Sequence, residues 1–244
     1  MARLSQRVRS VRVARGLLAS IVWLLPGLAP LRAGDGPPDP APSRFAGEIE
    51  KFERANQDDP PEPGSVLFLG SSSIKLWDLD AWFPDRGLVN RGFGGSQLSD
   101  VIHYADRLVA PVRPRLVFVY AGDNDIAAGK SPDRVLGDFL ALVDRVRAAS
   151  PEAKVVFLAI KPSIARKDDW PSMRRANTLV REACERGDHL AFLDVATPML
   201  TPQGGLRPEL YVADGLHLSR EGYAIWAETL APMLTQPGDG PSGP

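Results

Sequence analysis

The sequence predicts an α/β fold: a three-layer α/β/α sandwich with a mostly parallel, five-stranded sheet. Two observations carry this prediction. Short apolar runs of strand-forming residues alternate with amphipathic stretches of helical length, which is the pattern of βαβ units with helices on both faces of a sheet. The 244 residues also suffice for one domain with a buried core. Crossovers between the parallel strands are expected to be right-handed.

Five short segments are predicted to form the strands, because they are apolar and rich in β-branched or aromatic residues. Four of them are clear runs, and a shorter one lies between the first two. In chain order they are Val66–Leu69, Leu88–Val89, Leu116–Tyr120, Val155–Ile160 and Leu190–Leu193.

Helices are predicted where apolar residues recur at helical spacing. In the first of them, Arg44–Gln57, residues Phe45, Ile49 and Phe52 stand at i, i+4 and i+7. The segment DDPPEPG at 58–64 then ends this helix. The other predicted helices are Leu98–Leu108, Pro132–Ala148, Met173–Arg186 and Arg220–Met233.

The first 33 residues have the layout of a secretory signal peptide. Five arginines without an acidic residue precede a mostly apolar stretch, Gly16–Leu31, which ends near Ala33. Pro26, Pro30 and the short apolar length argue against a spanning helix, which needs about 20 apolar residues. We therefore expect a secreted or periplasmic protein with no stable membrane span after cleavage, or a membrane-anchored one if the signal stays uncleaved.

The single domain is expected over residues 44–235, between a linker and a tail. Residues 34–43 (GDGPPDPAPS) are rich in Pro, Gly and Asp and are predicted to be a linker. Residues 236–244 (QPGDGPSGP) are predicted to be disordered from their composition.

The composition narrows the range of partners. The net charge is −1 and no basic stripe follows the N-terminus, so no nucleic-acid partner is expected. Cys184 is the only cysteine, which excludes an intrachain disulfide and a cysteine-rich zinc site. No cofactor or metal is expected, and a monomer is the default.

Polar or glycine-rich segments follow the predicted strands. Open parallel sheets bind ligands just beyond the carboxyl ends of their strands, so these segments are expected to meet at one site. They are Gly70-Ser71-Ser72-Ser73, Asn90-Arg91-Gly92-Phe93-Gly94-Gly95-Ser96, Ala121-Gly122-Asp123-Asn124-Asp125 and, before the last helix, Asp214-Gly215-Leu216-His217.

These segments hold the groups that acyl transfer requires. A serine hydroxyl is a weak nucleophile until a base removes its proton, and an imidazole oriented by a carboxylate does this near neutral pH. Asp214 and His217 stand three residues apart, close enough for both to face one serine. A glycine N–H and an asparagine amide suit the oxyanion that forms.

With these blocks the chain resembles the SGNH, or GDSL-like, hydrolases, whose name comes from Ser, Gly, Asn and His in four blocks. The resemblance covers about residues 66–232 in the family's block order and implies a flavodoxin-like SGNH hydrolase fold. Carried over by position, it implies Ser72 as nucleophile and, through its N–H, first oxyanion donor. Gly95 and Asn124 would be the second and third donors. His217 would be the general base and Asp214 its orienting carboxylate.

One position departs from the family's pattern. The family commonly has Gly-Asp-Ser in its first block, whereas this chain has Gly70-Ser71-Ser72. Ser71 cannot supply a carboxylate's charge. Ser71 and Ser73 are expected to be helix caps or neighbours, with Ser71 as the alternative nucleophile.

Some residues of the four blocks could instead have structural roles, and these alternatives stay open. Asp214 could serve only as a turn residue, and Asn124 could form an Asx turn or part of a cation site, although a metal would need more oxygen ligands than this loop shows. Gly92 and Gly94 are expected only to permit a tight turn.

Polar and aromatic residues outside these roles are expected to be structural. For Arg91, Lys161 and Arg166, structural ion pairs are favoured over binding of an anionic substrate group. Trp77 and Trp82 are expected to pack in the core rather than stack on substrate. His103 and His189 are expected in an amphipathic helix and a polar turn.

These inferences predict a secreted serine esterase acting on a small-molecule or glycan ester. The resemblance allows acetylated sugars, short-chain esters, lysophospholipids and thioesters, and the lack of a large apolar lid favours a short or acetyl group. The sequence assigns no substrate-binding residues. The alternatives are a non-catalytic glycan-binding module that retains the fold and a metal-dependent phosphoesterase.

Overall fold

The computed structural model of the chain describes residues 36–234. The predicted signal peptide, the first residues of the predicted linker and the predicted tail lie outside these residues. Among the described helices, none is both long and apolar enough to cross a membrane.

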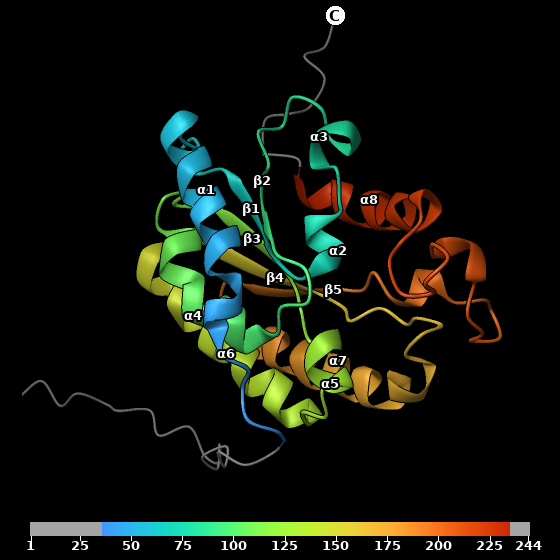
Figure 1. Cartoon of the computed structure of the whole chain (residues 1–244). Coiled ribbons are helices and arrows are strands. Elements are labelled where there is room, and N and C mark those ends of the chain that lie inside the picture. Colours follow the sequence, from blue (N-terminus) through green and yellow to red (C-terminus); the bar gives the residue numbers. More distant parts are fainter. Residues whose placement is uncertain (1–35, 235–244) are drawn as a thin grey trace, which may run out of the picture. The chain divides into compact units, whose positions relative to one another are not determined.

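The centre of the fold is a sheet of five parallel strands, as predicted (Figure 1). The strands follow the order β2-β1-β3-β4-β5 across the sheet. The chain therefore runs outward from β1 to β2 and then returns past β1 to β3. Such a reversal opens a crevice between the carboxyl ends of β1 and β3, where doubly wound folds bind their ligands. The strands are β1 (Val66–Gly70), β2 (Val89–Gly92), β3 (Leu116–Tyr120), β4 (Lys154–Leu158) and β5 (Leu190–Leu193).

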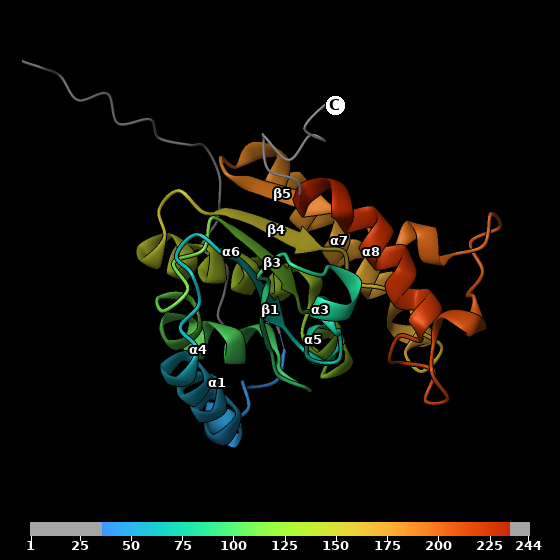
Figure 2. The same cartoon turned by 90° about the horizontal axis from the view of Figure 1, so that it is seen from above.

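Helices cover both faces of the sheet, which Figure 2 shows from above. One face packs against α1 (Ala46–Asp58), α4 (Leu98–Val109), α6 (Pro132–Ala149) and α7 (Trp170–Arg186). The other face packs against three helices, α2 (Ser72–Lys75), α3 (Leu79–Trp82) and α8 (Arg220–Leu234). A short helix, α5 (Asp123–Ala127), follows β3, and 3₁₀ turns lie at Pro42–Phe45, Lys167–Asp169, Thr197–Met199 and Pro208–Leu210.

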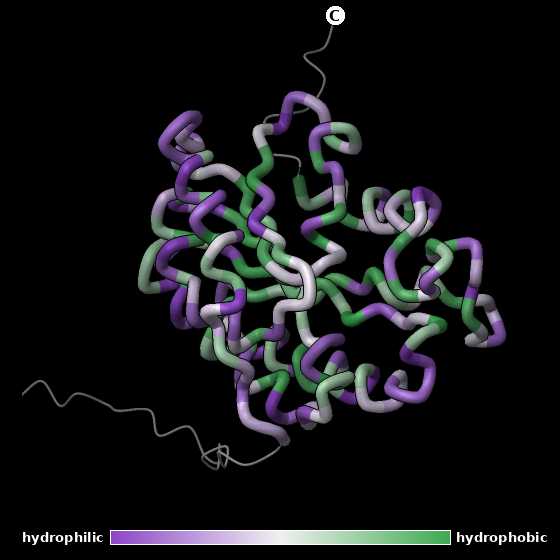
Figure 3. Tube along the Cα trace, in the orientation of Figure 1, coloured by the Kyte–Doolittle hydropathy of each residue, from purple (hydrophilic) through white to green (hydrophobic). Residues whose placement is uncertain are grey.

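Two cores form because side chains alternate along each buried strand. On β1, Leu67 and Leu69 enter the core under α4 and α6, whereas Phe68 enters the core under α8. The central strands β1 and β3 are accordingly mostly hydrophobic in the hydropathy view (Figure 3), whereas β2 at the sheet edge contains Asn90 and Arg91. The second core contains an aromatic cluster in which Trp77 lies 5.5 Å from Tyr223, ring centroid to ring centroid, so Trp77 packs as expected.

The predicted elements are all present, with shifted ends. The second strand is Val89–Gly92 rather than Leu88–Val89, and the fourth ends at Leu158 rather than Ile160. The helix expected from Met173 starts three residues earlier, at Trp170, where Pro171 occupies the first turn. A helix start was expected at the serines of α2 without a range, and α3 and α5 were not predicted, because four or five residues are too few to show a helical period.

Candidate active site

The first block sits at the crevice between β1 and β3 because Gly70 lets the two strand ends meet. Its φ is +141°, and a Cβ there would lie 1.9 Å from the Tyr120 carbonyl oxygen. Only glycine fits so close to a neighbouring backbone. The Ser71 N–H donates to the same carbonyl at 3.0 Å, and the chain then turns into α2, whose first residue is Ser72. The Ser72 side chain therefore stands at a helix N-terminus.

Ser72, His217 and Asp214 form one hydrogen-bonded chain. The distance from His217 Nε2 to Ser72 Oγ is 2.9 Å, and that from His217 Nδ1 to Asp214 Oδ2 is 2.6 Å. The pKa of Asp214 is lowered to about 2 by its hydrogen bonds to the His217 side chain and to the backbone N–H groups of Leu216 and His217. Asp214 therefore stays ionised and can hold the imidazole in one orientation.

The Asp214 side chain both shapes its own turn and contacts the His217 ring. Its Oδ1 accepts hydrogen bonds from the N–H groups of Leu216 at 2.8 Å and His217 at 2.9 Å. The turn is closed by the Val212 N–H, which donates to the His217 carbonyl at 2.9 Å. One carboxylate thus shapes the loop with one oxygen and holds the histidine ring with the other.

The loop after β2 lies beside Ser72. A Cβ at Gly94 would be 3.7 Å from the Ser72 Cβ, which places this backbone next to the serine. Within residues 36–234 the Gly95 N–H has no hydrogen-bond acceptor. Within β2, Asn90 connects this strand to α2, because its Nδ2 donates to the Ile74 carbonyl at 2.7 Å. Asn90 was not assigned this role from the sequence, and no sequence signal identifies it.

Asn124 lies at the start of α5, and both the nitrogen and the oxygen of its side-chain amide are hydrogen-bonded. Its Nδ2 donates to the Ser96 carbonyl at 2.9 Å, and its Oδ1 accepts from the Arg166 guanidinium at 2.8 Å. Reversing the amide would set oxygen against oxygen and nitrogen against a cation. The orientation of the amide is therefore determined, and the second Nδ2 hydrogen is left for another acceptor.

The three candidate anion-binding cations have protein partners, but among the described residues only Arg166 forms the ion pair expected from the sequence. Arg166 also pairs with Asp123 at 3.1 Å, and the buried Lys161 Nζ donates to the Leu216 carbonyl at 2.7 Å. Burial lowers the pKa of Lys161 to about 8. Arg91 lies at a different place, where it bonds Asn56. Arg166 and Lys161 thus hold Asn124 and the loop at Leu216 in place. Their sequence positions alone do not show this role.

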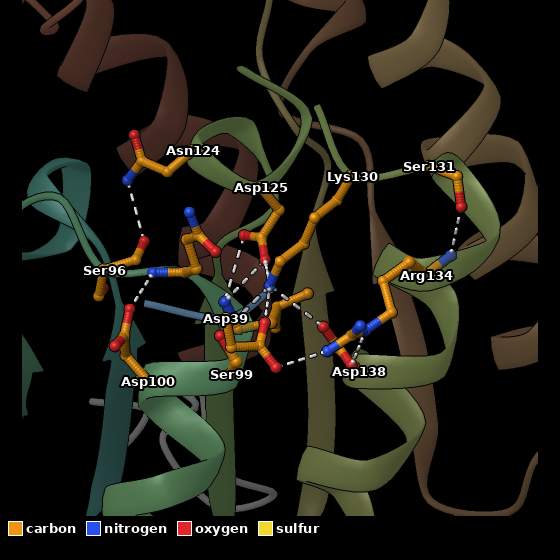
Figure 4. A network of polar contacts seen from close by, with 12 residues as sticks. Asp39, Ser96, Ser99, Asp100, Asn124, Asp125, Lys130, Ser131, Arg134 and Asp138 are labelled. Atoms are coloured by element: carbon orange, nitrogen blue, oxygen red, sulfur yellow. Dashed lines mark hydrogen bonds and ion pairs between the residues drawn. The ribbon is translucent and has the colours of Figure 1, made fainter. Parts of the chain in front are cut away.

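The carboxylates that flank Asn124 point to different cations. Asp123 pairs with Arg166, whereas Asp125 pairs with Lys130 at 3.0 Å (Figure 4). In the part of the chain that the structure describes, no three His, Cys, Asp or Glu side chains are grouped as metal ligands would be. The two carboxylates act as members of ion pairs.

Ser71 and the other histidines lie outside the Ser72–His217–Asp214 chain. Ser71 occupies the N-cap position of α2, as expected, but its buried Oγ has no hydrogen-bond partner among the described residues and makes no capping bond. The imidazole of His217 contacts Ser72 instead, which argues against Ser71 as the alternative nucleophile. His103 is exposed on α4, and His189 occupies a turn with a φ of 56°.

Comparison with known proteins identifies the family. The sequence model of the GDSL-like Lipase/Acylhydrolase family matches residues 77–225, and the chain belongs to this family. The match includes Gly95, Asn124, Asp214 and His217 but begins after Ser72. The connection of Ser72 with His217 is therefore supplied by the geometry. Membership supports ester hydrolysis as the general activity.

Curated relatives agree with this membership. The chain is 30% identical over 190 residues to platelet-activating factor acetylhydrolase IB subunit alpha1 from Bos taurus, covering 75% of this chain and 79% of the relative. It is 23% identical over 199 residues to the subunit alpha2 from Rattus norvegicus, covering 79% of this chain and 84% of the relative.

Solved structures share the fold at lower identity. A GDSL-like lipase from Bacteroides thetaiotaomicron superposes with a TM-score of 0.61 at 21% identity, covering 79% of this chain and 96% of that one. An acetylxylan esterase from Geobacillus stearothermophilus gives 0.59 at 16% identity, covering 72% and 97%. These similarities confirm the α/β fold class.

Proposed function

We propose that the protein is a serine esterase that works through an acyl-enzyme formed on Ser72. The observation that carries the proposal is the Ser72–His217–Asp214 chain, with distances of 2.9 and 2.6 Å. His217 takes the proton of the Ser72 hydroxyl as the oxygen attacks the ester carbonyl. It then passes this proton to the departing alcohol, and a water molecule activated in the same way releases the acid.

Three donors are proposed to stabilise the tetrahedral oxyanion. They are the backbone N–H of Ser72 at the start of α2, the unpaired N–H of Gly95 and the second Nδ2 hydrogen of Asn124. Donors held in place before reaction stabilise the developing charge without reorganisation. The contacts of Asn124 with Ser96 and Arg166 supply this order.

The proposed substrates are esters of acetic or other short-chain acids, on a small molecule or a glycan. The names of one relative and one protein of the same fold specify an acetyl group, the first on platelet-activating factor and the second on xylan. Three large apolar side chains are exposed on segments that carry or touch the triad: Leu76, Ile164 and Val212. They offer an apolar surface to the rest of the ester.

Secretion is part of the proposal and rests on the arginine-rich, then apolar, N-terminal 33 residues. N-terminal sequencing of the protein recovered from the medium or periplasm tests it. A mature chain that starts at or close to Gly34 is expected. A chain that keeps residues 1–33 and sediments with membranes would contradict cleavage.

The decisive experiment replaces Ser72 by alanine and measures hydrolysis of p-nitrophenyl acetate. We expect Ser72→Ala to abolish both hydrolysis and labelling by a fluorophosphonate. Ser71→Ala is the matched control, because it removes a neighbouring hydroxyl that has no partner, and it should retain both. Hydrolysis unchanged in Ser72→Ala would remove the mechanism.

The same assays separate the alternatives. A glycan-binding module without catalysis would bind acetylated polysaccharide but would neither hydrolyse it nor react with the fluorophosphonate. A metal-dependent phosphoesterase would lose its activity in EDTA. A panel of p-nitrophenyl esters from two to twelve acyl carbons (roughly the range from acetyl to lipid-like chains) then ranks the acyl groups.

A further inference from the structure

The segment of residues 36–39, predicted to be part of a linker, packs against the catalytic domain. The backbone of Gly36 has a φ of +136°, and a Cβ there would lie 2.9 Å from the Lys130 Cα. Three residues later, Asp39 Oδ1 lies 2.7 Å from the Lys130 Nζ. We call residues 36–39 the N-terminal strap. It lies outside the stretch matched by the family, which begins at residue 77.

Lys130 connects the strap to the domain interior. Its side chain is 1% exposed, and its Nζ lies 3.0 Å from Asp125 Oδ1 and 3.5 Å from Asp138 Oδ2. Arg134 closes the cluster, because it bonds Asp39 at 2.7 Å and Asp138 at 2.8 Å (Figure 4). The Asp39 carboxylate is the nearest acceptor of the ammonium and the only one on the strap. A buried ammonium needs such partners to offset its desolvation.

Asp125 carries the connection to the proposed oxyanion donors. It is fully buried, and both its oxygens lie 3.2 Å from the Leu98 N–H at the start of α4. Its neighbour Asn124 donates to the Ser96 carbonyl. Two consecutive residues of α5 therefore hold the segment that follows Gly95. These two links join the segment after Gly95 to α5, in addition to the bonds that Ser96 makes with the Gly70 and Phe93 carbonyls.

We propose that the N-terminal strap positions the oxyanion donors Gly95 and Asn124 through the chain of contacts Asp39–Lys130–Asp125. Asp39 is a positioning residue: it touches no reacting atom and acts through the carboxylate that fastens α5 to the start of α4. This inference rests on the proposed function, since it concerns the oxyanion donors of that reaction.

The test is Asp39→Ala in the full chain, with active enzyme counted by fluorophosphonate titration. We expect kcat on p-nitrophenyl acetate to fall about tenfold, with KM within about twofold, because small displacements of catalytic groups cost rate rather than binding. Asp39→Glu, which keeps the charge, should recover most of the rate. Asp133→Ala is the matched control: it removes an exposed carboxylate beside Arg134 that makes no contact with Lys130.

A second readout separates positioning from a general loss of stability. Sulfur accepts hydrogen bonds more weakly than oxygen, so a thionoester depends less on the oxyanion donors. If the strap positions those donors, Asp39→Ala loses more rate on the oxygen ester than on p-nitrophenyl thionoacetate. The effect of Asp39→Ala should also shrink in an Asn124→Ala background, because the two changes act on one unit.

The outcomes distinguish the inference from the proposed function. Native kcat per titrated site in Asp39→Ala, or equal losses on the two esters, would overturn the role of the strap. If Asp39→Ala yields too little folded protein, Asp39→Asn, which keeps the size of the side chain, is measured in the same way. Failure of the proposed function would show itself elsewhere, as hydrolysis that persists in Ser72→Ala.

Discussion

The amide of Asn124 is the most sharply testable part of the proposed active site. Its Oδ1 is occupied by Arg166 at 2.8 Å and one Nδ2 hydrogen by Ser96 at 2.9 Å, so one hydrogen remains for an oxyanion. Asn124→Ala removes this donor. Asn124→Asp keeps the size and the bond from Arg166 but sets a carboxylate oxygen against the Ser96 carbonyl. The two variants therefore remove the same donor in different ways.

The expected loss of kcat in the two Asn124 variants follows from these contacts. Loss of one oxyanion donor costs about 10²- to 10³-fold in kcat, or roughly 3 to 4 kcal/mol. Asn124 is partly exposed and is one of three proposed donors, so water can replace it in part. We expect about 10²-fold for Asn124→Ala and about 10³-fold for Asn124→Asp, where repulsion is added. Two lost hydrogen bonds lower the free energy of unfolding by about 2 kcal/mol, which a domain of this size tolerates.

The assay is steady-state hydrolysis of p-nitrophenyl acetate, normalised to the folded fraction from urea unfolding. The matched control is Asn56→Ala, which also breaks an asparagine–arginine hydrogen bond, with Arg91, away from Ser72. It should keep native kcat. A kcat for Asn124→Ala within about threefold of native would refute the role of the amide in the transition state.

Three further predictions concern backbone packing, pH and the first block. Gly92→Ala puts a Cβ 2.3 Å from the Lys75 backbone nitrogen, so it should displace α2 and cost about 1 to 3 kcal/mol in urea unfolding, unlike Gly94→Ala with contacts of 3.7 Å. Burial lowers the pKa of Lys161 from 10.5 to about 8. Between pH 8 and pH 10.5 the unfolded chain therefore binds more protons at Lys161 than the folded chain does. Stability relative to Lys161→Met should therefore rise by up to about 3 kcal/mol from pH 8 to 10.5, and a flat difference would contradict it. Ser71→Ala removes a buried hydroxyl without a partner, so chemical unfolding should show unchanged or higher stability, by about 1 kcal/mol.

The fold could be predicted because its signals are local. Strands buried on both faces are continuous apolar runs, and the long helices show their period over three or more turns. The turn at Gly70 and the helix α2 that presents Ser72 have no such signal, since four residues do not define a period. Their shape depends on the Tyr120 carbonyl, 50 residues further along the chain.

The site residues could be proposed from the sequence because a parallel sheet brings the carboxyl ends of its strands to one edge. Ser72 and Asn124 follow β1 and β3, which are neighbours in the sheet. His217 does not directly follow a strand, since a long connection separates it from β5, and it was proposed because Asp214 stands three residues before it. Its contact with Ser72 spans 145 positions of the chain.

The supporting residues were beyond reach of the sequence for a different reason. Lys130 and Asp39 are charged residues in polar segments, where solvent exposure is the default expectation, and for Arg166 an ion pair was expected but not its bond to Asn124. The structure instead places Lys130 under a segment rich in proline and glycine, with three carboxylates around its Nζ. Such a cluster is a property of tertiary packing alone.

The side-chain contacts that order Asn124 do not involve the first block. The family's aspartate is absent at position 71, and the Ser71 hydroxyl that stands there contacts nothing polar in the described chain. Order at the proposed oxyanion site is supplied from other directions: by Arg166 and Asp123 on one side of Asn124, and by Asp125 with Lys130 on the other. An enzyme built in this way should tolerate change at Ser71 and be sensitive to change at Arg166. Comparing kcat of Ser71→Ala with that of Arg166→Met tests this: equal rates would show that the ion pairs behind Asn124 do not order the site.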